Sequence, residues 1–351
     1  MKAIQSTGHT IFFDPEFTEL KQFISKKTYS KIFVLVDSNT EKYCLPILQP
    51  ILTDLSAFDV IEIDAGEENK NIDFCIGIWK TLLDFEADRH CLLINLGGGV
   101  VTDMGSFAAA TYKRGIDFIH IPTTLLAQVD AATGGKTGID MDHIKNIIGT
   151  FTQPKGVFII PDFLKTVIPL QLLSGFAEII KHGLVYDANY FNQIQHIDLH
   201  PIAPAIIYRS IEIKNEIVMV DPLETGLRKI LNFGHTIGHA IETYSLINTP
   251  WPLLHGEAIA IGIICEAYLS LQTGLSKDEL STIQQTVLAY YPKFELLETA
   301  FTDLIAIMKQ DKKNNSGQIN CSLLNKIGQC SIDNYCTEEA IYESMKYYQQ
   351  L

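Results

Sequence analysis

Apolar runs rich in β-branched residues alternate with amphipathic stretches in the first half of the chain. Runs at 31–36, 59–63, 91–96 and 117–121 have the length of strands, and residues 71–86 repeat with helical periodicity. Runs that are apolar throughout are typical of parallel strands covered by helices on both faces. The pattern therefore predicts an α/β domain built on a parallel sheet.

The pattern changes near residue 168, where we place a domain boundary. From there strand-like runs largely cease and apolar residues recur with helical spacing. Helices are expected at roughly 170–186, 204–219, 225–245, 256–272, 277–290 and 297–310. A short strand over 319–324 and a last helix after Thr337 complete the chain. The predicted fold class is α/β plus all-α, with an α/β domain over 1–168 and a helical domain over 169–351.

Composition is that of an ordinary globular protein, with 47% hydrophobic and 19% charged residues. A chain of 351 residues is longer than a single hydrophobic core usually supports, which favours two domains. The net charge of −14 argues against nucleic acid or an anionic membrane as partner, and leaves a small anionic substrate open. The seven cysteines are scattered without a C-x-x-C spacing, and the N-terminus lacks an apolar signal core. We therefore expect a cytoplasmic protein.

Two polar stretches interrupt the α/β pattern. Gly97-Gly98-Gly99 lies between the strand 91–96 and a helix through 107–110, where a backbone can approach a phosphate at a helix N-terminus. The spacing is not G-x-G-x-x-G, and a tight turn explains it equally well. The second stretch, 122–137, combines hydroxyls, glycines, a carboxylate and a lysine, which suits the lining of a polar site, although a solvated loop is the alternative.

Two histidines four residues apart, His235 and His239, project from one face of an apolar helix pattern. His255 opens another such pattern, and Glu178 stands three residues before Lys181 in a third. One carboxylate with two histidines is the ligand set of a catalytic zinc. Spacing alone favours His235 with His239, but the residues do not decide between the three histidines, and a pair of ordinary helix histidines is the other interpretation.

Several polar and glycine-containing segments occur together in this chain. They are Gly97–Val100 with Asp103, Pro122–Leu126 with Val129-Asp130, Gly134–Lys136, Lys145-Asn146, Gly175, Ala177-Glu178 with Lys181, Arg228, Asn232–Thr236, Gly238–Glu242 and His255–Glu257. In this combination the chain resembles the 3-dehydroquinate synthase family of sugar-phosphate cyclases. The resemblance extends from about Gly66 to Gly328, and a co-occurrence of this length is far more specific than any single motif.

The resemblance implies a Rossmann-like NAD-binding domain, a helical metal-binding domain and a carbon–oxygen lyase activity. Such an enzyme converts 3-deoxy-D-arabino-heptulosonate 7-phosphate into 3-dehydroquinate and phosphate, within the shikimate pathway of aromatic amino acid biosynthesis. It works by oxidation with NAD, elimination of phosphate, reduction and an aldol closure. The implied cofactors are NAD and zinc, with cobalt as an alternative, and the implied assembly is a homodimer.

The resemblance also implies roles for individual residues. The metal ligands are Glu178, His235 and His255, and His239 contacts the substrate. The pair that spacing favours, His235 with His239, is then not the ligand pair. The catalytic and substrate-binding residues are Asp130, Lys136, Asn146, Lys181, Lys214, Glu224, Arg228, Asn232, His239 and Lys312, with Lys313 as the alternative to Lys312. The NAD-binding residues are Asp37, Asn39, Glu67, Lys70, Gly98, Gly99, Val100, Thr102, Asp103, Thr123, Thr124, Lys136, Lys145, Phe163 and Thr166. For Asp37, at the end of a strand, a helix cap is an equally good interpretation.

The chain departs from the family pattern at Thr102, Ala131-Ala132, Ile160, Ile168 and Leu170. These departures fall on the predicted NAD side and the domain junction, not on the metal ligands or the lysines.

Three other functions remain open from the sequence. Another cyclase of the same superfamily would use the same zinc, NAD and elimination on a different sugar phosphate. A metal-dependent polyol dehydrogenase would form NADH in a net reaction and would need fewer anion-binding lysines. A catalytically silent NAD-binding or scaffolding protein would require lost ligands, whereas Glu178, His235 and His255 are present.

Overall fold

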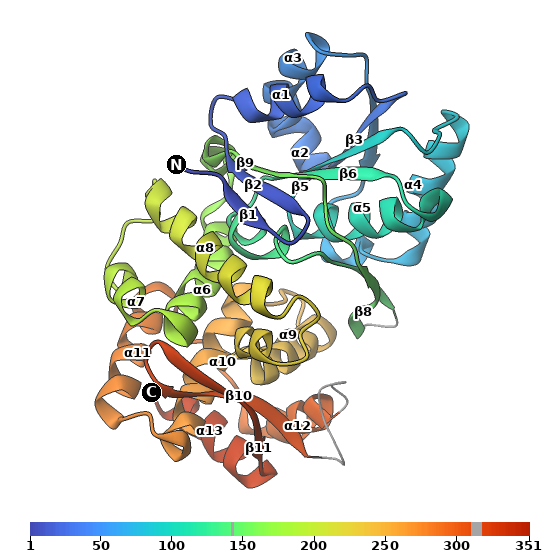
Figure 1. Cartoon of the computed structure of the whole chain (residues 1–351). Helices are drawn as coiled ribbons and strands as arrows, with labels where there is room; N and C mark the ends of the chain where they lie inside the picture. Colours follow the sequence, from blue (N-terminus) through green and yellow to red (C-terminus); the bar gives the residue numbers. More distant parts are fainter. Residues whose placement is uncertain (142–143, 310–317) are drawn as a thin grey trace. The chain divides into compact units, whose positions relative to one another are not determined.

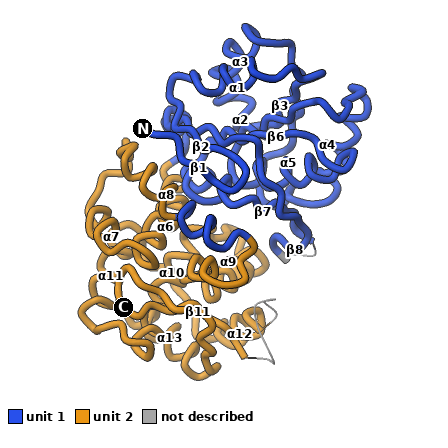
Figure 2. Tube along the Cα trace, in the orientation of Figure 1, with its two compact units in different colours: residues 1–168, 214–222 blue, residues 169–213, 223–351 orange. Residues whose placement is uncertain are grey.

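The computed structural model describes residues 1–141, 144–309 and 318–351. The chain forms two compact units, which Figure 2 distinguishes by colour. The first comprises Met1–Ile168 together with Lys214–Pro222, and the second comprises Pro169–Ile213 with Leu223–Leu351.

The first unit is built on a seven-stranded sheet, most of whose strands are labelled in Figure 1. The strand order is β1-β2-β9-β6-β5-β3-β4. Its strands are β1 (Ile4–Ser6), β2 (His9–Phe13), β3 (Ile32–Asp37), β4 (Asp59–Ile63), β5 (Leu92–Gly97), β6 (Asp117–Pro122) and β9 (Val157–Ile159). All neighbours pair in parallel except β1 and β2, which are antiparallel at one edge. From β3 to β9 the strands follow the doubly wound order 2-1-3-4-5, and the order reverses between β3 and β5.

Helices cover both faces of this sheet, as the apolar strands predict. The helices are α1 (Thr18–Lys26), α2 (Ser38–Tyr43), α3 (Leu45–Thr53), α4 (Ile72–Asp84) and α5 (Gly99–Thr111). Phe33 and Leu35 of β3 pack in one core cluster with residues of α4 and α5. Val34 and Val36 of the same strand pack in the opposite cluster with residues of α1 and α3. The alternation of side chains along a strand thus supplies two cores.

A separate antiparallel pair, β7 (Lys136–Met141) and β8 (Ile144–Phe151), lies in the first unit, and β7 packs on α5. Its strands were not expected from the sequence, which indicated a polar stretch ending at 137. Glycines enable the close pairing, since a Cβ on Gly149 would lie 2.0 Å from the carbonyl oxygen of Thr137.

The second unit is mainly helical and also contains an antiparallel pair of strands, β10 (Ile319–Lys326) and β11 (Gln329–Cys336). Its helices are α6 (Pro169–Tyr186), α7 (Ala188–Ile194), α8 (Pro204–Val220, whose end belongs to the first unit), α9 (His235–Asn248), α10 (His255–Leu269), α11 (Lys277–Tyr290), α12 (Phe301–Lys309) and α13 (Glu338–Gln350). Helix α10 is buried on nearly every side, and α6, α9, α11 and α13 pack around it.

One predicted helix is wrong in its extent. The stretch expected as a single helix over 225–245 is a 3₁₀ turn, Leu227–Asn232, followed by α9. Gly234 separates the two because its φ of 79° lies in the left-handed region, where a helix cannot continue. The break makes His235 the first residue of a helix.

Within the described residues, no helix combines the length and the apolar character that crossing a membrane requires.

Candidate active site

The turn after β5 brings the start of α5 to the carboxyl end of the sheet. α5 begins at Gly99, and Gly98 precedes it as an N-cap without a side chain. This helix start lies beside the end of β3, at Asp37, because β3 and β5 are neighbours at the point where the strand order reverses. Doubly wound sheets bind their ligands at this point, and free N–H groups at a helix N-terminus suit a phosphate. A Cβ on Gly98 would lie 3.1 Å from Cγ2 of Thr124, so glycine keeps the turn close to the next loop.

Asp37 also has a structural task. Its carboxylate accepts the N–H of Thr40 at 2.8 Å, and its own N–H donates to Oγ1 of Thr40 at 2.8 Å. This is a capping box at the start of α2. The capping role considered for Asp37 from the sequence is therefore present, and its contact with NAD stays a prediction.

A buried lysine joins two other predicted site residues. Lys70 is 3% exposed, and its ammonium donates to Asp103 at 2.7 Å and to Oδ1 of Asn146 at 2.6 Å. Burial lowers the pKa of Lys70, but the nearby Asp103 and Glu67 outweigh it and raise the pKa, so the ammonium stays charged. Lys145 forms a further ion pair with Glu67 at 3.3 Å. The sequence thus predicted residues that gather in one network of the first unit.

The other predicted NAD-binding residues differ in how far their side chains are exposed. Thr102 is 1% exposed, and its hydroxyl donates to the carbonyl oxygens of Gly98 and Gly99 at 3.2 and 3.1 Å. Phe163 is buried in the core, and the exposed Thr166 donates its hydroxyl to the carbonyl oxygen of Phe163. The side chains of Thr102 and Phe163 are thus enclosed by protein. Thr123 is buried, Val100 and Thr124 are half-buried, and Asn39 is exposed on α2.

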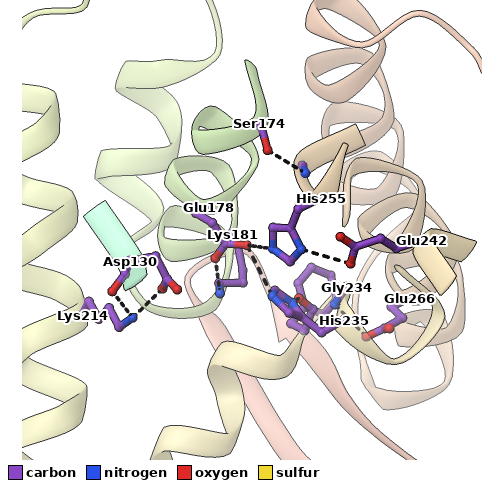
Figure 3. Close-up of polar contacts among 12 residues, drawn as sticks. Asp130, Ser174, Glu178, Lys181, Lys214, Gly234, His235, Glu242, His255 and Glu266 are labelled. Atoms are coloured by element: carbon purple, nitrogen blue, oxygen red, sulfur yellow. Dashed lines mark hydrogen bonds and ion pairs between the residues drawn. The ribbon is translucent and has the colours of Figure 1, made fainter. Parts of the chain in front are cut away.

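Two residues predicted to act on the substrate form an ion pair in the first unit. The ammonium of Lys214, a residue 5% exposed, lies 2.8 Å from Oδ1 of Asp130 and donates to the backbone oxygen of the same residue (Figure 3). Lys136 is exposed at the first position of β7. The structure therefore pairs Lys214 with Asp130.

Three predicted metal ligands converge in the second unit, each from a different helix (Figure 3). Glu178 of α6 is fully buried, His235 is the first residue of α9, and His255 is the first residue of α10. Nε2 of His235 lies 3.3 Å from Oε1 of Glu178, and Nε2 of His255 lies 3.4 Å from the same oxygen. Two ligands bound tetrahedrally at zinc's usual distances are separated by about 3.3 Å, so these spacings fit one ion.

The hydrogen-bond partners of the two Nδ1 atoms show why a cation fits between the Nε2 atoms and Glu178. Nδ1 of His235 lies 3.1 Å from the carbonyl oxygen of Phe233, and Nδ1 of His255 lies 3.3 Å from Oε2 of Glu242. Each Nδ1 therefore carries the hydrogen in the neutral ring, which leaves a lone pair on Nε2. When both rings are neutral, two such lone pairs face a carboxylate oxygen, and a metal ion that takes the place of the His255 proton satisfies all three groups.

Electrostatics differ between the two imidazoles. Burial, reinforced by the Lys181 ammonium, lowers the pKa of His235 to about 4. Burial also acts to lower the pKa of His255, but Glu242 and Glu178 outweigh it and raise the pKa to about 9. Burial would raise the pKa of Glu178, yet its ion pair with Lys181 and the nearby His235 hold that pKa well below its usual range. Glu178 is therefore ionised, as a ligand must be.

His239 lies beside the two other histidines. Its ring centroid is 5.0 Å from that of His235 and 5.7 Å from that of His255, and one ligand atom from each ring falls within 4.8 Å of the others. The i, i+4 spacing thus does bring His235 and His239 together, as their helix positions predict. The contacts with Glu178 belong to His235 and His255, and the division of roles between the three histidines stays a prediction.

The segment before α9 gathers further predicted residues. Arg228 is 2% exposed in the 3₁₀ turn, and Nδ2 of Asn232 donates to Oε1 of Glu224 at 2.9 Å. Glu224 has a φ of 59°, a left-handed conformation that few residues other than glycine adopt. Lys312 and Lys313 lie outside the described residues.

Glu242 was not among the site residues predicted from the sequence. Its contact with Nδ1 of His255 makes it the carboxylate that orients this histidine, one of the predicted ligands. Glu242 stands seven positions after His235 on the same helix, and residues at i, i+4 and i+7 share one face. That spacing was the signal that would have identified it.

Comparison with known proteins places the chain in a family. Residues 60–174 match the sequence model of the 3-dehydroquinate synthase N-terminal region, and residues 175–314 match that of the C-terminal region. The chain belongs to the 3-dehydroquinate synthase family. A 3-dehydroquinate synthase of Parabacteroides distasonis is 42% identical over 95% of both chains. Another, from Campylobacter jejuni, is 38% identical over 91% of this chain and 93% of its own. The resemblance drawn from the motifs is confirmed.

Solved structures share the fold of this chain. A 2-deoxy-scyllo-inosose synthase complexed with carbaglucose-6-phosphate, NAD+ and Co2+ aligns with a TM-score of 0.84 at 21% identity, over 99% of this chain and all of that one. A 2-epi-5-epi-valiolone synthase of Streptomyces hygroscopicus with NAD+ and Zn2+ bound aligns with the same score at 24% identity, over 100% and 99%. A probable glycerol dehydrogenase of Sinorhizobium meliloti aligns less closely, with a TM-score of 0.60 at 14% identity, over 100% and 98%. The predicted α/β plus helical fold class is confirmed.

Proposed function

We propose that this chain is a 3-dehydroquinate synthase that converts 3-deoxy-D-arabino-heptulosonate 7-phosphate into 3-dehydroquinate and phosphate. Family membership supports the reaction. The observation that carries the chemistry is the convergence of Glu178, His235 and His255, with both Nδ1 atoms of the histidines engaged elsewhere. We further propose that NAD is held by the domain over 1–168, and one zinc or cobalt ion by the domain over 169–351.

The residues present suit both groups. When bound, the metal would lower the pKa of a substrate hydroxyl. NAD would accept a hydride from the carbon that bears this hydroxyl and later return it. Glu178, His235 and His255 would hold the ion. The glycine turn before α5, with Asp37, Lys70 and Asp103, would hold the dinucleotide at the end of the sheet.

The chain's own residues would manage the substrate's charges and protons. Lys181 and Arg228 are buried cations of the second unit, and Lys214 is a buried cation of the first. Such groups suit the carboxylate and the phosphate of the substrate, with arginine binding an anion in a bidentate manner. Lys136 and Lys312 are proposed to add to them. The polar residues proposed to orient hydroxyls and hold protons are Asp130, Asn146, Glu224, Asn232 and His239.

Phosphate release with catalytic NAD is the deciding assay. Incubated with the heptulosonate phosphate, the protein should release one phosphate per substrate consumed while NAD is far below the substrate concentration. NADH should not accumulate, because the hydride returns to the molecule from which it came. NADH that grows in step with substrate loss, without phosphate, would favour the polyol dehydrogenase. Turnover of a different sugar phosphate in place of this one would favour another cyclase.

His239 offers a test that separates substrate chemistry from metal binding. His239→Ala should keep the ion, because Glu178, His235 and His255 remain, and should lose about 100-fold in kcat/KM, the lower range for a residue that handles protons. Elemental analysis and the phosphate assay measure the two effects. His255→Ala serves as the comparison and should lose the ion. Loss of metal from His239→Ala with retention by His255→Ala would reverse the assignment.

We also propose a homodimer in the cytoplasm, on the basis of family membership. Seven free cysteines suit a reducing compartment. Sedimentation equilibrium at micromolar concentration tests the dimer, and a monomer there would contradict it.

A further inference from the structure

Glu266 is a buried carboxylate in the middle of the apolar helix α10. It is fully buried, within the run Ile263-Ile264-Cys265-Glu266-Ala267. A buried charge needs partners, and Glu266 takes two of them from the backbone of another helix. Its Oε2 accepts the N–H of Gly234 at 2.7 Å (Figure 3). Its Oε1 accepts the N–H of Ile237 at 3.0 Å.

These two amides are the ones that a capping box satisfies. Gly234 is the N-cap of α9, and Ile237 is the third residue of that helix. In a capping box, the N-cap side chain accepts the N–H of the third residue, and the side chain of the third residue accepts the N–H of the N-cap. Here one carboxylate from α10 performs both tasks, and its negative charge suits the helix N-terminus.

Close contact between the helices explains why the cap comes from outside α9. A Cβ on Gly262 would lie 2.0 Å from the carbonyl oxygen of Gly234, and a Cβ on Gly234 would lie 2.7 Å from Cγ1 of Ile263. Gly234 also has a φ of 79°. An N-cap residue with its own side chain is therefore excluded at position 234, and Glu266 on the facing helix replaces it.

The capped helix start is the one that carries a metal ligand. His235 follows Gly234 directly, and its ring must face Glu178 beside His255, the first residue of α10. The start of α10 is itself held by the N–H of Gly256, which donates to Oγ of Ser174 in α6 at 3.0 Å. Side chains that accept helix-start amides thus connect the three helices from which the ligands come.

We propose that Glu266 is a positioning residue of the metal site. By capping α9 from α10, it fixes Nε2 of His235 against Nε2 of His255 before a metal binds. The inference rests on the proposed function, in which both histidines are ligands.

The test compares Glu266→Gln with a matched control. Glutamine keeps the size of the side chain but points an NH2 group at one of the two amides, so only one of them is accepted. Glu279→Gln is the control, because the oxygens of Glu279 also accept two backbone amides, from Ser276 at 3.0 Å and Ile327 at 2.9 Å, without contacting a ligand helix start. Zinc affinity is measured by competition with a chelator, the zinc-induced rise in Tm by calorimetry, and the ligand geometry by the visible spectrum of the cobalt form.

Glu266→Gln should bind zinc about 10- to 100-fold more weakly, the usual effect of losing a supporting residue, with a smaller zinc-induced rise in Tm and an altered cobalt spectrum. Glu279→Gln should lower Tm alone. Wild-type zinc affinity in Glu266→Gln would overturn the inference by itself, whereas failure of the wild-type chain to bind zinc would overturn the proposed metal site as well.

If Glu266→Gln does not fold, hydrogen exchange in the wild-type chain decides. The amides of Gly234 and Ile237 should be protected in the metal-free protein as much as in the zinc form. Rapid exchange that zinc alone suppresses would show that the metal, not Glu266, orders the start of α9.

Discussion

Replacement of His235 by alanine should remove the metal and the activity together. His235 supplies one of the two nitrogens that face Glu178, and the substitution leaves only Glu178 and His255 of the three proposed ligands. Loss of a ligand should exceed the effect of losing a supporting residue, so zinc affinity should fall by more than about 100-fold. Metal content by elemental analysis and phosphate release measure the two losses in one preparation.

A distant histidine controls for the substitution itself. His196 is exposed in the same unit, and His196→Ala should keep both metal and turnover. A stoichiometric metal ion with full activity in His235→Ala would contradict the assignment of His235 as a ligand.

Lys181→Met should abolish most of the turnover while NAD binding is retained. Lys181 is 2% exposed and forms an ion pair with Glu178 in its own helix, and methionine has a similar length without the charge. If the ammonium stabilises negative charge as phosphate leaves, kcat should fall by about 100- to 1000-fold. NAD titration should match the wild type, because the proposed NAD residues belong to the first unit. Steady-state phosphate release and calorimetric titration measure the two quantities.

The matched control is Lys229→Met. Lys229 forms an ion pair with Asp333 at 3.1 Å, and both side chains are at least one-third exposed, so little should change. Equal losses of turnover in the two variants would indicate a general effect of removing a lysine, and normal turnover in Lys181→Met would refute its role.

The central strands of the first unit could be predicted because burial on both faces leaves long apolar runs. β3, β4, β5 and β6 lie within a residue or so of the predicted runs. β1 and β9 were missed because three-residue strands carry too short a pattern, and their pairing depends on distant partners. In the second unit the apolar periodicity continues through Gly234, so the break before α9 could not be read from periodicity alone.

The site also contains residues that the sequence could predict and residues that it could not. Residues that are close in sequence, such as Glu178 and Lys181, could be paired from their spacing. The ligand set could not, because the packing of α9 on α10 decides which imidazoles face the carboxylate. Glu266 has no neighbouring motif to mark it, although a carboxylate in the middle of an apolar helix was a sign that it serves a partner elsewhere.

The pairing of Glu178 with Lys181 bears on how the protein matures. Two opposite charges within a single helix turn are balanced as soon as that helix forms, so the carboxylate can be buried without help from an ion. Folding and metal acquisition are then separable events, and the electrostatics impose no order on them. A cell that controls its supply of the metal would thereby control how much of this protein is active, without changing how much of it folds.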